Sequence, residues 1–266
     1  MTDREYRNAP GISRSQLWKL HDSSPEKFKW AMEHPEEPTP ALIFGQAAHK
    51  LLLEPDGFDD AFIVSPGFDR RTKEGKAAYA AFCAAKGDRT EIDPADYETI
   101  KAMVEKARST PFVSRLLQGE REKPIFWTDE LTGERCKARL DCLTELGEEM
   151  LIIDYKSTAD ASETAFMKSV INYGYDFQTA HYTEAVKSIT DKPSRFIFIA
   201  QEKTAPYAVN LFEAEPLMVR RGYDIFRETL GLYHECRESC NWYGYLGPDE
   251  HINMLSLPAW AAKELS

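Results

Sequence analysis

The sequence predicts an α/β fold in which a mixed central sheet of about five strands is flanked by helices and preceded by a helical N-terminal region. Three observations predict it. Residues 11–118 carry repeated helix starts followed by apolar residues at helical spacing. Residues 120–235 carry five short segments rich in strand formers, with helical patterns between the third and the fourth. The length of 266 residues and the hydrophobic content of 42% suit one large core, so we expect residues 1–266 to form a single domain that ends in a tail, 241–266.

Helix-capping residues open the predicted helices of the N-terminal region. Ser13 with Gln16 three residues later is typical of a capping box. Ser24 and Asp93 each precede a proline suited to a first helical turn. The polar stretch around Gly75 is expected to be loop. The predicted helices span residues 13–21, 24–33, 41–54, 76–86 and 93–108.

The sheet region follows, and its first three strands are joined by short turns. Because the turns at Gly133 and Gly147 are short, we expect these strands to form an antiparallel meander. The five predicted strands span residues 122–128, 134–144, 150–156, 195–201 and 207–212. The helices predicted around them span residues 162–170, 177–189 and 216–236.

Charged residues close the third predicted strand. Asp154 and Lys156 follow an apolar run, and their side chains share one face, about 6.6 Å apart along the strand, because alternate strand residues point the same way. Asp141 is expected on the neighbouring strand. Burial of ionisable groups beside an apolar core is costly unless they are paired or bind a metal. The trio therefore predicts a metal site, and hard oxygen donors favour Mg²⁺, with Mn²⁺ able to substitute.

Five short motifs occur in order along the chain. They are "FGQAAHK" with His49, "EKPIFW" with Glu122, "ARLD" ending at Asp141, "DYK" from Asp154 to Lys156, and "QTAHY" with Gln178 and Tyr182. Together they resemble the PD-(D/E)XK nuclease superfamily, and within it the phage-type recombination exonucleases of the exodeoxyribonuclease VIII kind. Leu140 stands where the superfamily's name has proline, and Glu120 competes with Glu122 for the upstream acid.

The resemblance spans about residues 11–235 and implies a fold and an activity. It implies a restriction-endonuclease-like core and a Mg²⁺-dependent exonuclease that digests one strand of linear duplex DNA from its end, 5′ to 3′. It further implies a role in single-strand annealing recombination, with an annealing protein as partner and a ring-like homo-oligomer threaded by DNA.

The resemblance also implies roles for individual residues. Catalytic roles fall to His49, Glu122, Asp141, Asp154 and Lys156, and the metal ligands are Asp141, Asp154, the Tyr155 backbone carbonyl, Glu122 and His49, around one ion or two. Carboxylates and phosphate favour the charged form of Lys156, so we expect this ammonium to stabilise charge rather than act as a base. Gln178 and Tyr182, four residues apart on one helix face, are expected to contact phosphates of the cut strand.

The formal net charge of −11 opposes a DNA partner unless basic residues are concentrated locally. Two basic tracks meet this condition. Arg70, Arg71, Lys73 and Lys76 form the first. Arg135, Lys137 and Arg139 form the second, and alternate residues place them on one strand face with Asp141. Of the second track, Arg139 is the candidate DNA contact.

Other functions and sites remain as alternatives. An endonuclease or resolvase of the same superfamily is the nearest alternative, and a DNA-binding or partner-binding module that does not cut is another.

The sequence contains neither an apolar run long enough for a membrane span nor a signal-peptide pattern at its N-terminus, so the cytoplasm is expected. The five cysteines are expected to be reduced thiols.

Two further constellations are interpreted as structural. Two C-terminal cysteines, Cys236 and Cys240, lack the paired spacing of a zinc or iron-sulfur site, even with His234 nearby. The alternating aromatic residues Tyr173, Tyr175 and Phe177 could stack bases but are interpreted as packing.

The tail is rich in aromatic residues, namely Trp242, Tyr243, Tyr245 and Trp260. It could dock on the body or on a neighbouring subunit.

Overall fold

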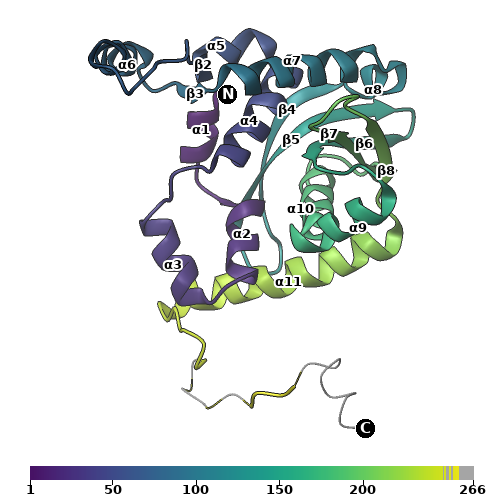
Figure 1. Ribbon diagram of the computed structural model, residues 1–266. Coiled ribbons are helices and arrows are strands. Elements are labelled where there is room, and N and C mark those ends of the chain that lie inside the picture. Colours follow the sequence, from purple (N-terminus) through teal and green to yellow (C-terminus); the bar gives the residue numbers. More distant parts are fainter. Residues whose placement is uncertain (248, 250–251, 253, 258–266) are drawn as a thin grey trace.

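The structure is a computed structural model of the chain and describes residues 1–247, 249, 252 and 254–257. Helices cover both faces of a central six-stranded sheet, and a two-stranded sheet lies beside it (Figure 1). The helices are α1 (Asp3–Asn8), α2 (Arg14–His21), α3 (Pro25–Glu33), α4 (Pro40–Leu53), α5 (Phe58–Ala61), α6 (Lys73–Lys86), α7 (Pro94–Ser109), α8 (Pro111–Leu116), α9 (Glu163–Asn172), α10 (Tyr175–Lys187) and α11 (Pro216–Ser239). The strands are β1 (Ile12–Ser13), β2 (Phe62–Val64), β3 (Thr90–Ile92), β4 (Glu120–Thr128), β5 (Arg135–Leu146), β6 (Glu149–Thr158), β7 (Ser194–Glu202) and β8 (Val209–Glu213).

The predicted N-terminal helices are confirmed, and their caps act as the sequence indicates. Ser13 and Gln16 form the capping box of α2, and Ser24 and Asp93 cap α3 and α7. The prediction of loop around Gly75 is wrong. Thr72 accepts a hydrogen bond from the Gly75 N–H and thereby starts α6 at residue 73.

Several short elements were not predicted: α1, β1, α5, α8, and the paired strands β2 and β3. Elements this short are not stable alone and depend on contacts with the rest of the fold. Lys137 supplies such a contact for α1. Its ammonium donates to the carbonyl oxygens of Tyr6, Arg7 and Ala9 at distances of 2.7 to 3.2 Å. Lys137 is therefore engaged at the end of α1 and is buried, rather than free in a basic track.

The central sheet contains the five predicted strands and the short β1. Its order is β1-β5-β6-β7-β8, with β4 paired to β5. The meander is confirmed, because β4 with β5 and β5 with β6 are antiparallel, whereas β6 pairs with β7 in parallel. The sheet is therefore mixed, as predicted.

Two apolar layers enclose the sheet, and the alternation of β6 decides which layer each of its side chains enters. Leu151 and Ile153 pack with α4 and α7 on one face. Ile152 packs with Phe166 of α9 and Val186 of α10 on the other face. Because Asp154 follows in the same alternation as Ile152, its carboxylate is directed toward α10.

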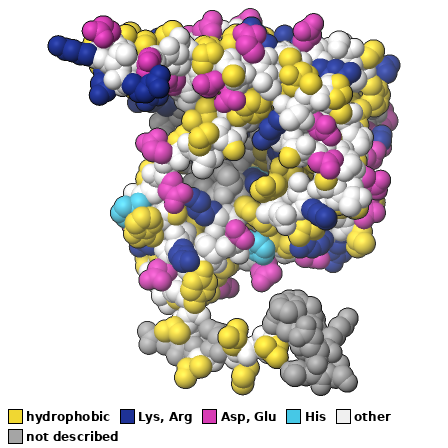
Figure 2. Space-filling view, in the orientation of Figure 1, with side chains coloured by type: hydrophobic (Ala, Val, Ile, Leu, Met, Phe, Trp, Pro, Cys, Tyr) yellow, Lys and Arg dark blue, Asp and Glu magenta, His cyan; other side chains and the backbone are white. Residues whose placement is uncertain are grey.

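Helix α6 projects from the body and carries basic residues. None of its residues, all of which are described, is buried. Six Lys or Arg and three Asp or Glu lie between residues 69 and 89. Figure 2 shows dark blue Lys and Arg side chains gathered on this projection at the upper left, where Figure 1 places α6.

The start of the tail, residues 242–245, packs on α3. Trp242 stacks on Phe28 with ring centres 5.6 Å apart, and the Glu26 N–H donates to the Tyr243 carbonyl oxygen at 3.1 Å. Tyr245 lies beside Lys27, whose ammonium donates to its hydroxyl at 3.1 Å. These aromatic residues therefore dock on the body, whereas Trp260 lies outside the described residues.

Within the described residues, none of the helices combines the length and the apolar character needed to cross a bilayer. Each of the five cysteines is a free thiol.

Candidate metal centre

Asp141 lies where the backbone ladders on both edges of β5 are interrupted. On one edge, β5 pairs with β1 up to Lys137 and with β6 only from Cys142 onward. On the other edge, the register with β4 passes over Asp141. The Asp141 carboxylate fills part of the first gap, because its Oδ2 accepts a hydrogen bond from the Tyr155 N–H at 2.8 Å. The sheet thus opens around this aspartate.

Glu122 lies opposite Asp141 on β4 and has an unusual backbone. Its φ is 50°, in the left-handed region that non-glycine residues rarely adopt, and the β4 ladder skips it. Its side chain is only 8% exposed. The competing acid, Glu120, is exposed and pairs with Lys123. The structure therefore brings Glu122 rather than Glu120 to Asp141.

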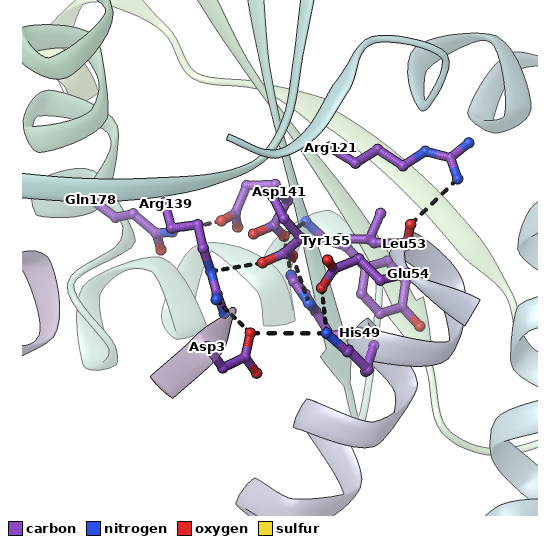
Figure 3. A network of polar contacts seen from close by, with 12 residues as sticks. Asp3, His49, Leu53, Glu54, Arg121, Arg139, Asp141, Tyr155 and Gln178 are labelled. Carbon is purple, nitrogen blue, oxygen red and sulfur yellow. Dashed lines mark hydrogen bonds and ion pairs between the residues drawn. The ribbon is translucent and has the colours of Figure 1, made fainter. Parts of the chain in front are cut away.

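His49 joins these two carboxylates from α4. Its Nε2 lies 2.8 Å from Asp141 Oδ2, and its Nδ1 lies 3.3 Å from Glu122 Oε1. Each of the three residues offers one potential ligand atom, and these atoms lie within 4.8 Å of one another. Figure 3 shows the network converging from α4, β5, β6 and α10.

Asp154 lies next to this trio and is held from two sides. Its Oδ2 is 2.7 Å from Lys156 Nζ, and its Oδ1 accepts a hydrogen bond of 2.6 Å from Gln178 Nε2. Asp154 is fully buried and Gln178 is 4% exposed. Gln178 therefore orients the carboxylate from α10, a contact that the sequence did not indicate, and its predicted phosphate contact stays a prediction.

The charges of the cluster are strongly coupled. Burial opposes the charge of His49, but Asp141 and Glu122 outweigh it and raise the pKa of the imidazole to about 9. Burial raises the pKa of Glu122 to about 7 and that of Asp154 to about 6. Burial also acts on Asp141, yet His49 holds the pKa of Asp141 below its usual value. The cluster is thus a buried group of carboxylates that a protonated histidine partly neutralises.

Lys156 remains an ammonium in this setting. Burial disfavours its charge, but Asp154 and Asp141 dominate and raise the pKa of Lys156. This agrees with the expectation that Lys156 stabilises negative charge instead of taking up a proton.

A second layer of charge surrounds Glu122. Arg139 Nε lies 2.7 Å from Glu122 Oε2, and Arg139 Nη1 lies 2.5 Å from Asp3 Oδ1. Lys50 bridges Glu54, at 2.6 Å, and Asp3, at 3.9 Å. Arg139, a predicted DNA contact, therefore supports Glu122 in this structure. Asp3 was not predicted as a site residue, because its helix, α1, carries no apolar pattern.

The donor set fits a hard divalent cation. Glu122 Oε1 and Asp154 Oδ2 are buried and, among the described residues, accept no hydrogen bond. Each faces only an ion-pair partner, His49 or Lys156. Buried carboxylate oxygens without donors are costly, and a cation bound by carboxylates and one imidazole would satisfy them. His49, Glu122 and Asp141 are the best-grouped ligands.

The remaining predicted site residues are two tyrosines in or near the sheet and the basic residues near the start of α6. The Tyr155 side chain points into the core, where its hydroxyl donates to Gln201 at 2.8 Å, so only its backbone is available to the site. Burial, then the charge of Asp154, raises the pKa of Tyr182 well above its usual value. The Tyr182 ring packs against the apolar layer that contains Phe196, and its phosphate contact stays a prediction. Arg70, Arg71, Lys73 and Lys76 lie at the start of α6 or just before it, and no hydrogen bond or ion pair of the described residues joins them to the cluster.

His234 and Glu238, on either side of Cys236 in α11, form with Glu134 a second group of potential ligands whose atoms lie within 4.8 Å of one another. His234 Nδ1 and Arg237 Nε lie 2.8 and 2.9 Å from Glu134 Oε1, so this carboxylate already has two partners. Cys236 is buried and Cys240 exposed.

Comparisons with known proteins identify a family model and a similar fold. A family model described as "PDDEXK-like domain of unknown function (DUF3799)" matches residues 13–253. A crystal structure from Eubacterium rectale, named "Putative exonuclease", is 15% identical with a TM-score of 0.65, and the match covers 99% of this chain and 97% of that one. A solved structure of SSO0001 reaches a TM-score of only 0.38 at 13% identity, over 85% of this chain and 77% of that one. None of the curated proteins matches the sequence.

Proposed function

Since the chain belongs to the family of PDDEXK-like domains of unknown function (DUF3799), we propose that it is a Mg²⁺-dependent DNA exonuclease that hydrolyses one strand of linear duplex DNA. The restriction-endonuclease-like α/β fold predicted from the sequence is confirmed. The family and the likeness to the protein named "Putative exonuclease" support a nuclease. The 5′ to 3′ direction and the role in single-strand annealing recombination belong to the proposal and follow from the motif resemblance.

One observation carries the proposal. His49, Glu122 and Asp141 offer ligand atoms within 4.8 Å of one another, directly beside the buried Asp154 and Lys156 pair. Such a group of carboxylates is expensive to bury, and its ion pairs leave Glu122 Oε1 and Asp154 Oδ2 without a hydrogen bond among the described residues. A site for a cation that acts on phosphodiesters explains the group.

A bound Mg²⁺ would supply an activated water and charge stabilisation at phosphoryl oxygens. His49, Glu122, Asp141, Asp154 and the Tyr155 carbonyl are the residues that would hold it. Lys156 keeps its proton, so its ammonium is available to stabilise the negative charge that develops on the phosphate. Gln178 fixes the orientation of the Asp154 carboxylate through its amide.

A chain with a net charge of −11 needs a local group of cations to bind DNA, and the region of α6 supplies one. Arg70, Arg71, Lys73 and Lys76 are exposed at the start of this projecting helix or just before it. We infer that this projection grips the duplex while the strand end reaches the metal centre. A ring-like homo-oligomer, duplex DNA ends as substrate and an annealing protein as partner complete the proposal.

Linear and covalently closed duplexes, each incubated with the protein and Mg²⁺, test the proposed activity. We expect the linear duplex to be shortened from its ends and the closed circle to survive. Labels on each 5′ and 3′ end would identify the direction of digestion. Cutting of the closed circle would replace the exonuclease with an endonuclease, and tight binding without any cutting would favour a DNA-binding module.

The Asp154→Asn variant tests the site. We expect it to lower the rate on the order of 100-fold or more, because it removes charge at the reacting centre. The matched control is Glu148→Gln, which changes an exposed carboxylate in the turn between β5 and β6 and should leave the rate unchanged. If Asp154→Asn digested DNA as fast as the control, the site would be wrongly assigned.

A further inference from the structure

A pair of tyrosines lies at the junction of α9 and α10, where Tyr173 follows α9 and Tyr175 is the first residue of α10. Tyr173 is 58% exposed, whereas Tyr175 is half-buried against Phe166 and Phe198. Of the three aromatic residues interpreted as packing in the sequence, only Phe177 is a fully buried core residue. Packing in the core therefore does not explain Tyr173.

The turn that presents Tyr173 is fixed in place by α2. Arg14 Nη2 donates to the carbonyl oxygens of both Tyr173 and Gly174, the latter at 2.6 Å. Gly174 has a φ of +61°, and the Trp18 ring packs so closely on it that a Cβ would overlap the ring. The backbone that carries the exposed ring is therefore rigid, which reduces the entropy lost when a ligand binds to it.

The tyrosine pair is continuous with the metal centre. Lys156 Nζ lies 4.9 Å from the centre of the Tyr175 ring, and the same ammonium is 2.7 Å from Asp154 Oδ2. The Tyr173 and Tyr175 ring centres are 5.8 Å apart with an interplanar angle of 35°. From Asp154, the side chains of Lys156, Tyr175 and Tyr173 thus lead outward to the surface, one in contact with the next.

We propose that Tyr173, supported by Tyr175, is a stacking platform for an unpaired nucleobase of the strand whose phosphate lies at the metal centre. This inference rests on the proposed function and deepens it. Stacking on a tyrosine tolerates any base, because every base has an aromatic face. The platform therefore gives the site affinity for a separated strand without sequence preference.

The position of the rings favours a nucleobase over a protein partner. A strand that places a phosphate beside Lys156 carries its bases alongside, and Tyr175 is the ring nearest to that ammonium. The occupant is thus a flat, apolar-faced group attached to a phosphate chain.

Binding of single-stranded oligonucleotides tests the platform without any hydrolysis. The probe carries 2-aminopurine at one of the first few positions from its end, and the protein is the Asp154→Asn variant in buffer with EDTA. We expect the base at one position to be quenched on binding. Adding Tyr173→Ser should abolish this quenching and weaken binding about tenfold, whereas adding Tyr173→Phe should preserve both.

An abasic probe separates stacking from a purely structural effect. With the base at the quenched position removed, the Tyr173→Ser variant and the protein that keeps Tyr173 should bind the probe equally. Phe112→Ser, a change at another exposed aromatic residue, on α8, is the matched control and should alter neither quenching nor affinity. Thermal unfolding of each variant checks that the fold is intact.

The results separate this inference from the proposed function. If the wild-type protein digests linear DNA but Tyr173→Ser leaves quenching and affinity unchanged, the proposed stacking platform is wrong. The proposed nuclease function is then still supported. Equal losses in Tyr173→Phe and Tyr173→Ser, or a loss that persists with the abasic probe, would also overturn the platform. If the wild-type protein digests no DNA, the proposed function itself fails.

Discussion

At the scale of single residues, Glu122 is the most strained position of the candidate site. Its φ of 50° lies in a region that costs a residue with a Cβ about 1 to 2 kcal/mol, and its carboxylate is buried next to Asp141. Such strain persists only where the surroundings enforce it, and it is concentrated at functional sites. Here the interrupted ladder turns the Glu122 side chain toward His49 and Arg139.

We expect Glu122→Gly to be more stable than Glu122→Ala by about 1 kcal/mol, because glycine adopts a positive φ without the steric cost of a Cβ. Both variants lose the carboxylate, so the difference between their free energies of unfolding reports the backbone conformation alone. Denaturant unfolding measures it. Lys123→Gly and Lys123→Ala are the matched pair at the next strand position, where alanine should be the more stable. If alanine were more stable than glycine at position 122 as well as at position 123, the backbone strain assigned to Glu122 would be wrong.

At the same scale, His181 is a buried polar residue inside the core whose ring nitrogens are unpaired among the described residues. It is fully buried on α10, and neither ring nitrogen has a hydrogen-bond partner among the described residues. Trp127, Phe177 and Phe226 surround its ring. Burial, followed by the charge of Arg14, lowers the pKa of His181 to about 3.

We expect His181→Leu to raise the stability at neutral pH by about 1 kcal/mol, because it removes buried polar atoms that lack partners. The gain should grow on acidification. The unfolded imidazole binds a proton below a pKa near 6.5 while the folded one stays neutral down to about 3, so wild-type stability falls by up to about 1.4 kcal/mol per pH unit in that window. Urea unfolding near pH 7.5 and pH 5 measures this. The change His21→Leu at an exposed histidine is the control, and a gain for His181→Leu that did not depend on pH would contradict the assignment.

At the scale of elements, the contact between α10 and α11 holds the helix that carries Gln178. Gly222 lies against the Asp176 carbonyl so closely that a Cβ would overlap it, and the buried Asp176 carboxylate pairs with Arg221. The two helices therefore approach each other at a glycine, and this approach sets the position of α10 over Asp154.

Two glycines of α11 give opposite predictions. Gly231→Ala should raise the stability by about 1 kcal/mol, because its Cβ would meet open space and alanine favours the helix. Gly222→Ala should lower the stability by about 1 to 3 kcal/mol, since the added Cβ forces α11 away from α10. Denaturant unfolding measures both. If Gly222→Ala were as stable as Gly231→Ala, the close approach of the helices would be wrong.

The elements also show which parts of the fold a sequence can predict. Helices with a cap and an apolar period, such as α3 and α7, and the strands of the meander were predicted closely. The short α1, β1 and β2 were not, because segments of this length owe their structure to partners elsewhere in the chain. The missed α1 matters most, since it brings Asp3 to Arg139.

At the scale of the whole molecule, charge is unevenly distributed. The chain has a formal net charge of −11, yet Lys and Arg outnumber Asp and Glu six to three between residues 69 and 89. Carboxylates collect at the metal centre, and cations collect on the projecting α6 (Figure 2). This separation is compatible with a polyanion held at one place and cut at another.

We expect the double change Lys73→Gln with Lys76→Gln to weaken duplex DNA binding and to reduce the slope of log affinity against log salt by about 1 for each lysine that contacts a phosphate. Titration at several salt concentrations measures the slope. Arg195→Gln, at an exposed arginine that pairs with Glu213 at the edge of the sheet, is the control. An unchanged slope in the double variant would remove α6 from the proposed DNA-binding surface.

The sequence by itself determined the fold class and the meander and pointed to Asp141 and Asp154 as candidate ligands, because these depend on local periodicity, capping and motif order. The tertiary structure alone decided how the acids meet. It placed Glu122 rather than Glu120 next to Asp141 through a left-handed backbone at Glu122, and it engaged Gln178 with Asp154. It also fixed Lys137 to α1 and left Tyr173 exposed beside Tyr175. The physical reason is that each of these outcomes depends on which distant segment occupies the space next to a side chain, and that is decided only when helices and strands pack together.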